Sequence, residues 1–178
     1  MKKILVLLCF VSFSGLFANA QSVMGIERLT PKEDVFQQLK TRYGILRVHD
    51  EGDHIFITDP TMGSFQFKLG FMYMDMIDGV SKFNGASFQT YFNPTENAKA
   101  KEERDYLLRL IRQKYEDELY VEFENGDGFK CCEFGNDPRT NRPIGNVKLI
   151  RDQGKDGVDR LYLILTYFQF VDTMLDDF

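Results

Sequence analysis

The chain has 178 residues, of which 43% are hydrophobic and 28% are charged, and its formal net charge is −5 at pH 7. This length suffices for a single domain with its own hydrophobic core. An acidic chain without a block rich in lysine and arginine is poorly suited to nucleic acid or to anionic lipid, so we expect neither as a partner.

The N-terminus has the pattern of a cleavable secretion signal at residues 1–20. Lys2 and Lys3 precede an apolar stretch over residues 4–17, and Ala18-Asn19-Ala20 supplies the small-x-small cleavage pattern before Gln21. The apolar stretch is short for a permanent membrane helix, which makes an N-terminal anchor the weaker alternative. We therefore expect an exported protein, periplasmic or secreted, whose mature part (21–178) is one domain without an integral membrane segment.

Two helices are predicted by matching start signals. Thr30-Pro31-Lys32-Glu33 and Asn93-Pro94-Thr95-Glu96 each place a capping side chain first, then proline, and then glutamate at the third helical position. Apolar residues follow at helical spacing, ending at Tyr43 in the first segment and at Tyr115 in the second. We expect both helices to bury these stripes against a sheet.

Each predicted helix is followed by predicted strands, separated by turn-forming residues such as Asn125-Gly126. The first run covers 45–48, 54–58, 64–74 and 86–92, and the second covers 119–124, 129–134, 146–150 and 161–171. Both runs close on Thr-Tyr-Phe, at 90–92 and at 166–168. The pattern predicts an α+β fold of two tandem repeats, 24–92 and 93–171, each with one helix and about four antiparallel strands. Both helices are expected on one sheet face, and a short acidic tail follows the second repeat.

Gly25-Ile26, the helix predicted from Thr30 to Tyr43 and the strands after it resemble a small exported repeat. That repeat is shared by β-lactamase-inhibitor-like proteins and the SmpA/OmlA outer-membrane assembly lipoproteins. The resemblance covers most of residues 24–171 and implies a short helix followed by a four-stranded antiparallel sheet, in tandem copies. The chain has Arg42-Tyr43-Gly44 where that family has Gly-x-Pro, and it lacks the lipobox cysteine, departures that weigh against the assembly role. A cystatin-like helix-on-sheet repeat fits the same pattern nearly as well.

A first cluster of possible metal ligands lies at a predicted turn. His49 and His54 flank Asp50-Glu51-Gly52-Asp53. Imidazoles and carboxylates bind zinc, but structural zinc sites have tighter and recurrent ligand spacing. We interpret this segment as a polar hairpin tip, in which acidic residues and glycine serve the turn.

A second cluster contains Asp152, Asp156 and Asp159. Calcium would need a carboxylate where Gly154 stands and a closing glutamate where Leu163 stands. We therefore interpret the segment as a loop between strands, and we predict no metal and no cofactor for the chain.

The two cysteines of the mature chain, Cys131 and Cys132, are adjacent. Neighbouring strand residues point to opposite faces, so an ordinary disulfide between them is not expected. A catalytic cysteine would need a base, and the histidines lie in the other predicted repeat. The sequence also lacks a serine elbow and a phosphate-binding loop, so we predict no catalytic residues.

Apolar alternation assigns faces to two of the predicted strands. In 64–74, the odd-numbered residues from Phe65 to Tyr73 are expected to face the helix, with Met72 and Met74 outward. In the last strand, alignment on Thr-Tyr-Phe places Ile164 and Thr166 toward the helices.

That alignment leaves an apolar row on the opposite face of the last strand, with two interpretations. The row is either covered within the chain, as in a central strand, or exposed to a protein partner or to a second copy of the chain. The loop 135–143 would flank such a contact, with two arginines able to pair with carboxylates. The candidate partner surface comprises Leu161, Leu163, Leu165, Tyr167, Arg139 and Arg142.

These observations favour an exported, non-enzymatic binding or interaction protein of the bacterial cell envelope. Its partner would be another protein or a second copy of the chain. The alternatives are a secreted or periplasmic hydrolase with a carboxylate or metal site, and a self-associating structural protein.

Overall fold

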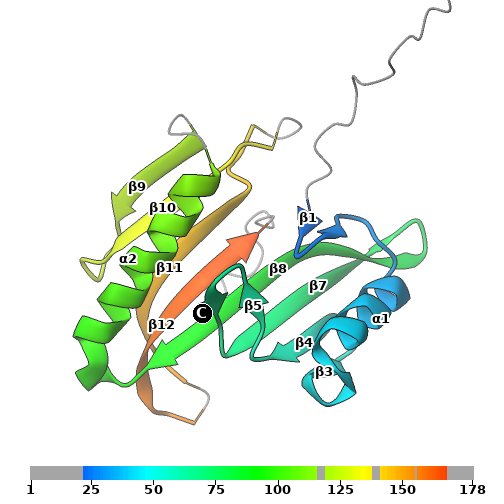
Figure 1. Cartoon of the computed structure of the whole chain (residues 1–178), viewed down its shortest axis with the longest axis horizontal. Helices are drawn as coiled ribbons and strands as arrows, with labels where there is room; N and C mark the ends of the chain where they lie inside the picture. The colour runs from blue at the N-terminus through cyan, green and yellow to red at the C-terminus, as the bar shows by residue number, and fades with distance from the viewer. Residues whose placement is uncertain (1–21, 116–118, 138–140, 155, 168–178) are drawn as a thin grey trace, which may run out of the picture.

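A computed structural model describes residues 22–115, 119–137, 141–154 and 156–167. Its main feature is an eight-stranded antiparallel sheet with the strand order β3-β4-β7-β8-β12-β11-β10-β9 (Figure 1). In chain order, the strands of this sheet are β3 (Val48–Asp50), β4 (His54–Thr58), β7 (Leu69–Ile77), β8 (Val80–Phe92), β9 (Tyr120–Glu124), β10 (Lys130–Phe134), β11 (Gly145–Gln153) and β12 (Asp159–Tyr167).

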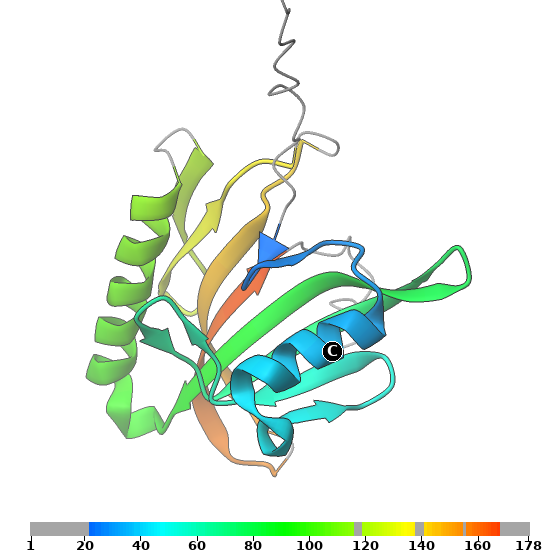
Figure 2. The same cartoon turned by 45° about the vertical axis from the view of Figure 1, so that its right-hand side comes forward.

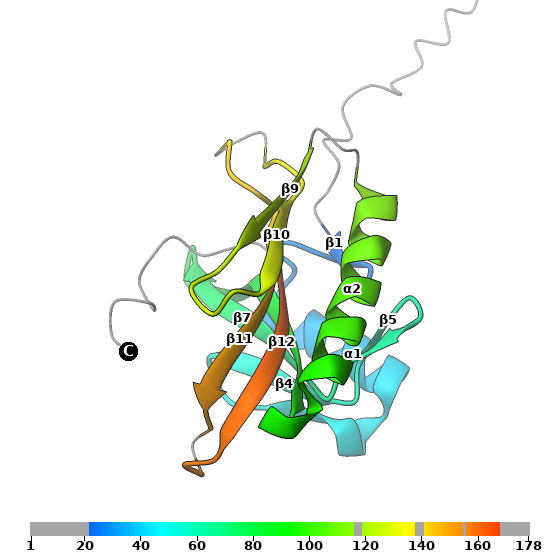
Figure 3. The same ribbon diagram turned by 90° about the vertical axis from the view of Figure 1, so that its left-hand side faces the viewer.

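Two helices, α1 (Lys32–Tyr43) and α2 (Asn97–Lys114), lie on the same face of the sheet (Figure 3). We call it the helix face. Single 3-10 turns, η1 (Ile45–Arg47) and η2 (Pro94–Glu96), follow α1 and precede α2. Two short hairpins complete the described chain: β1 (Ser22–Val23) with β2 (Ile26–Glu27), and β5 (Thr61–Met62) with β6 (Phe65–Gln66). The β5–β6 hairpin lies between the two helices (Figure 2).

The two predicted helix starts differ in the structure. At the second, the backbone N–H of Asn93 donates to the Glu96 carboxylate at 2.9 Å, as a capping box requires. At the first, the Thr30 hydroxyl donates instead to the carbonyl oxygen of Glu27 at 2.7 Å, and α1 begins at Lys32 without a side-chain cap. The predicted cap at Thr30 is therefore wrong.

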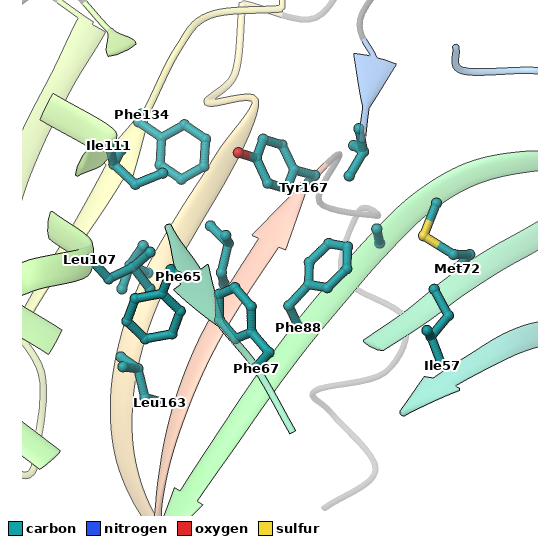
Figure 4. Packing of buried hydrophobic residues seen from close by; sticks show 14 of the residues in the cluster. Ile57, Phe65, Phe67, Met72, Phe88, Leu107, Ile111, Phe134, Leu163 and Tyr167 are labelled. Carbon is teal, nitrogen blue, oxygen red and sulfur yellow. The ribbon is translucent and has the colours of Figure 1, made fainter. Parts of the chain in front are cut away.

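The hydrophobic core lies between the helix face and the helices. Phe88 from β8, Leu163 from β12 and Leu107 from α2 are at most 2% exposed. Phe65 and Phe67, from the β5–β6 hairpin and the residue after it, pack over β8 and β12 (Figure 4). Full burial of one such side chain stabilises the fold by roughly 1.5–3 kcal/mol, so the hairpin acts as an anchor between the helices.

The expected α+β fold of two tandem repeats is wrong, because the described chain is mostly β and strands from both predicted repeats form one continuous eight-stranded sheet. The last strands of the two predicted repeats, β8 and β12, pair antiparallel from Phe92 opposite Leu161 to Ala86 opposite Tyr167. The two halves also differ in their parts, since α1 has 12 residues, α2 has 18, and the β5–β6 hairpin occurs in the first half.

The predicted faces of 64–74 are correct for its first part and wrong for β7. Phe67 is 1% exposed on the helix face, as expected, but Met72 is also fully buried there, whereas Phe71 and Tyr73 lie on the other face and are half-buried. The reason is an interruption at residues 67–68 between β6 and β7, where the backbone N–H of Lys68 donates to the Gln89 carbonyl. A one-residue change of this kind reverses every side chain that follows.

Candidate functional site

The sheet face that points away from α1 and α2 is not covered by any described element (Figure 3). We call it the open face. Large apolar side chains from five neighbouring strands occupy it, each of them partly exposed: Phe56, Leu69, Phe71, Tyr73, Tyr91, Tyr162, Ile164 and Ile150. At the far edge, Val121 and Phe123 of β9 are 60% and 37% exposed.

Aromatic contacts order one end of the open face, across β4 and β7. The ring centroids of Phe56 and Phe71 lie 5.5 Å apart, and Phe71 stacks on Tyr73 at 6.4 Å with an interplanar angle of 13°. His54 joins them, with its ring centroid 5.7 Å from that of Phe71. Contacts of this kind fix the rings in place, so they present a preformed apolar surface.

A second aromatic group lies at the centre of the strand order, where β8 meets β12. The rings of Tyr91 and Tyr162 lie 6.3 Å apart. Two cations approach the Tyr91 ring: the Lys68 ammonium, 3.8 Å from its centroid, and the Arg160 guanidinium, 5.5 Å from it. Arg160 is itself held by two contacts to the Asp156 carboxylate, at 2.7 and 2.5 Å, and these contacts lower the pKa of Asp156 to about 2.

On the helix face, a groove of about 700 Å³ separates α2 from the β5–β6 hairpin. Its lining includes Phe65, Phe67 and Thr90 of β8. At the rim, the hydroxyl oxygens of Ser64 and Tyr106 lie 2.6 Å apart and join the hairpin to the helix. The groove therefore has fixed walls and combines aromatic with polar lining.

Most of the candidate partner surface expected from the sequence lies in the hydrophobic core. Its four β12 residues, Leu161, Leu163, Leu165 and Tyr167, are at most 2% exposed on the helix face. They pack in the core with α2, so they offer no surface to a partner. Arg142 is exposed, and Arg139 lies outside the described residues.

The error on β12 arose from aligning the two Thr-Tyr-Phe segments. Thr90 lies on the helix face, where it lines the groove and pairs with Leu163, whereas Thr166 pairs with Ser87 on the open face. Corresponding residues of the two tripeptides therefore point to opposite faces of the sheet. Ile164, expected toward the helices, lies on the open face instead, and the run from Leu161 to Leu165 offers no alternation from which its faces could be assigned.

The histidine-containing turn forms one contact with α1 and one between two of its own side chains. Asp50 accepts from the Lys32 ammonium at 2.5 Å, which lowers the pKa of Asp50, and Asp53 contacts Nδ1 of His54 at 2.6 Å. His49 is exposed on β3 beside Phe56. Within the described ranges, no three His, Cys, Asp or Glu side chains converge as metal ligands.

Cys131 and Cys132 are free and fully buried, and they point to opposite faces of β10. Burial raises the pKa of both thiols, that of Cys132 to about 12. A thiol that stays protonated is a poor nucleophile, so both cysteines act as small apolar residues.

The open face and the groove both combine apolar and aromatic side chains with charged and hydrogen-bonding groups. Among the described residues, no helix is long and apolar enough to cross a membrane. Comparison with family models, with curated proteins and with solved structures finds no match for this chain.

Proposed function

We propose that the chain is an exported, non-enzymatic binding protein of the cell envelope, which holds another protein against its open face. The observation that carries this proposal is the row of partly exposed aromatic and aliphatic side chains on that face. Contiguous apolar patches of this kind mark interaction sites in soluble proteins.

The composition of the open face supports a protein partner. Tyrosine and arginine dominate the energetics of protein interfaces, and Tyr91, Tyr162 and Arg160 lie together where β8 meets β12. Their mutual contacts hold them in place before a partner arrives, which lowers the entropy cost of binding.

The buried cysteines are compatible with export. An oxidising compartment modifies thiols that are exposed and deprotonated. Both Cys131 and Cys132 are fully buried with raised pKa values, so they would persist as free thiols there. The signal pattern of residues 1–20 supports the same compartment.

Site-specific photo-crosslinking in cells tests the proposal. A photoreactive amino acid replaces Phe71 in one variant and Ile164 in another, because both side chains lie on the open face. The control replaces Leu46, which is 87% exposed and lies in η1 after α1. Adducts are then separated by mass and identified by mass spectrometry.

We expect both open-face positions to yield the same adduct with one other exported protein, and position 46 to yield none of it. An adduct of twice the chain's own mass would instead show that the face joins two copies. Equal adduct patterns from all three positions would contradict the proposal.

A further inference from the structure

The eight-stranded sheet has two outer strands, β3 and β9, and their free edges differ in protection (Figure 1). Natural sheets protect their edges with short strands, proline and charged side chains, above all lysine. β3 has only three residues, and its Asp50 forms an ion pair with Lys32 of α1. β9 has five residues and contains neither proline nor lysine. The edge of β9 is therefore the less protected of the two.

The hydrogen bonds between β9 and β10 show which backbone groups lie at that edge. Beyond one end of the strand pair, the backbone N–H of Gly135 donates to the carbonyl oxygen of Leu119 at 2.7 Å. Hydrogen-bonded residues alternate along antiparallel strands, so Val121 and Phe123 bond to β10 and their neighbours do not. The N–H and C=O groups of three residues therefore point away from the sheet: Tyr120, Glu122 and Glu124. In the described part of the chain, no strand pairs with them.

The side chains of β9 continue both faces of the sheet to this edge. Val121 and Phe123 are exposed on the open face. On the other side, Tyr120 packs in the core below α2, and Glu122 and Glu124 are exposed. A strand added to β9 would therefore place apolar side chains beside the open-face pair and polar side chains beside the two glutamates.

Charge argues against a second copy of the chain as that added strand. Antiparallel pairing of two β9 strands over all five residues would place Glu122 opposite the same residue of the other copy. Like charges directly opposite each other destabilise a strand pair. Among the described residues, the Glu122 carboxylate accepts from the Tyr120 hydroxyl at 3.0 Å and forms no ion pair. The glutamate thus protects the edge against self-association and leaves it open to a different sequence.

We propose that the protein held on the open face adds an extended segment to β9 as a ninth strand, paired through the outward backbone groups. This inference rests on the function proposed above. The segment is amphipathic, with apolar side chains beside Val121 and Phe123 and polar ones beside Glu122. Because Arg112 and Lys130 line the hollow next to Glu122, the polar side chains are not restricted to one sign of charge. Strand addition of this kind gives affinity through main-chain hydrogen bonds and specificity through alternate side chains.

Photo-crosslinking from β9 in cells tests the inference. The photoreactive amino acid replaces Val121, first in the otherwise unchanged chain and then in two pairs of variants. Glu122→Pro and Glu124→Pro each remove one outward N–H and put the proline ring where the added strand would pair. The matched controls, Glu122→Ala and Glu124→Ala, remove the same side chain and keep the N–H. Melting temperatures of the purified variants report whether each one is folded.

We expect position 121 to yield an adduct with the same exported protein as positions 71 and 164. Each proline variant should lower the yield of this adduct by about tenfold relative to its alanine control. Equal yields from the proline and alanine variants would show a contact of side chains alone and would overturn strand addition. Unfolding of both proline variants would show that these N–H groups already pair within the chain, which would also overturn it.

The remaining outcomes separate this inference from the function on which it rests. Adducts from positions 71 and 164 without one from position 121 would overturn strand addition and leave the binding function of the open face intact. The absence of an adduct from all three positions would contradict both. An adduct of twice the chain's own mass from position 121 would show that a second copy covers the edge, and would overturn the choice of partner.

Discussion

The two faces of the eight-stranded sheet are similar in composition and different in surroundings. On the helix face, Phe88 is fully buried against Phe67 from the hairpin, with the ring centroids 5.6 Å apart. On the open face, Phe71 and Tyr73 contact each other and remain partly exposed. Aromatic residues are buried in the core on one side of the sheet and remain partly exposed on the other.

Apolar content alone therefore does not distinguish a buried strand face from a partly exposed one. Adjacent residues of one strand, such as Leu163 and Ile164, are nearly equal in hydrophobicity and face opposite ways. What separates them is the placement of α2 and the β5–β6 hairpin, which cover Leu163 and leave Ile164 uncovered.

Substitution of those adjacent residues should give the largest difference between the faces. Leu163→Ala should lower the free energy of unfolding by about 2–5 kcal/mol, because it removes a fully buried side chain and leaves a cavity. Ile164→Ala, the matched change on the open face, should cost about 1 kcal/mol because its side chain is already partly exposed. Urea denaturation measures both, and equal losses would show that the open face is buried as deeply as the helix face.

The close packing of the helix face predicts a second contrast, between two glycines. A Cβ atom at Gly145 would collide with the backbone carbonyl oxygen of Thr166 and with the Phe134 ring. Gly145→Ala should therefore cost about 1–3 kcal/mol. At Gly126 a Cβ atom meets nothing within 4 Å, so Gly126→Ala should stay within about 0.5 kcal/mol. Comparable melting temperatures for the two variants would contradict the packing described at β11.

Buried ionisable groups on the helix face predict a pH dependence. Burial raises the pKa of Cys132 from 9.0 to about 12, so the folded chain keeps a proton that the unfolded chain releases. The associated stability is present below pH 9 and is lost as the pH rises from 9 to about 12. Cys132→Ala should lose less stability than the parent chain over that interval. Parallel profiles of unfolding free energy against pH would show that the thiol does not contribute.

The smallest effect is expected at an exposed ion pair beside the open face. Arg160 lowers the pKa of Asp156 to about 2, so the contribution of the pair is present above the ordinary pKa near 4 and is lost as the pH falls toward 2. Because both groups are solvated, Asp156→Asn should change the melting temperature at pH 7 only slightly. A large change would show that Asp156 also organises the turn between β11 and β12.

Much of the local structure could be predicted from the sequence. The strand predicted at 54–58 has the bounds of β4, and those predicted at 119–124 and 129–134 differ from β9 and β10 by one residue at the start. Alternation and turn residues act locally, so the sequence contains their signals.

The faces of β7 and β12 could not be predicted in the same way. The interruption before Leu69 leaves no mark in the apolar pattern, and β12 is apolar on both sides from Leu161 to Leu165. The groove could not be predicted from the sequence either, because Thr90, Phe65 and Glu102 come from three separate elements that meet through tertiary packing. The spacing of residues along the sequence does not predict contacts between elements that only the tertiary fold brings together.

Oxidative footprinting of the two faces tests whether the aromatic rings of the open face are exposed in the isolated protein and covered by a partner in the cell envelope. Hydroxyl radicals modify exposed rings, and mass spectrometry reports the extent of modification of each ring. In the isolated protein, we predict strong modification of Phe71, Tyr91 and Tyr162 and protection of Phe88 and Phe134. In intact cell envelopes, the first three should become protected because the partner covers them. Protection of all five rings in the isolated protein would contradict the exposure of the open face, and modification of Phe71, Tyr91 and Tyr162 that is unchanged in the envelope would contradict its role as a binding surface.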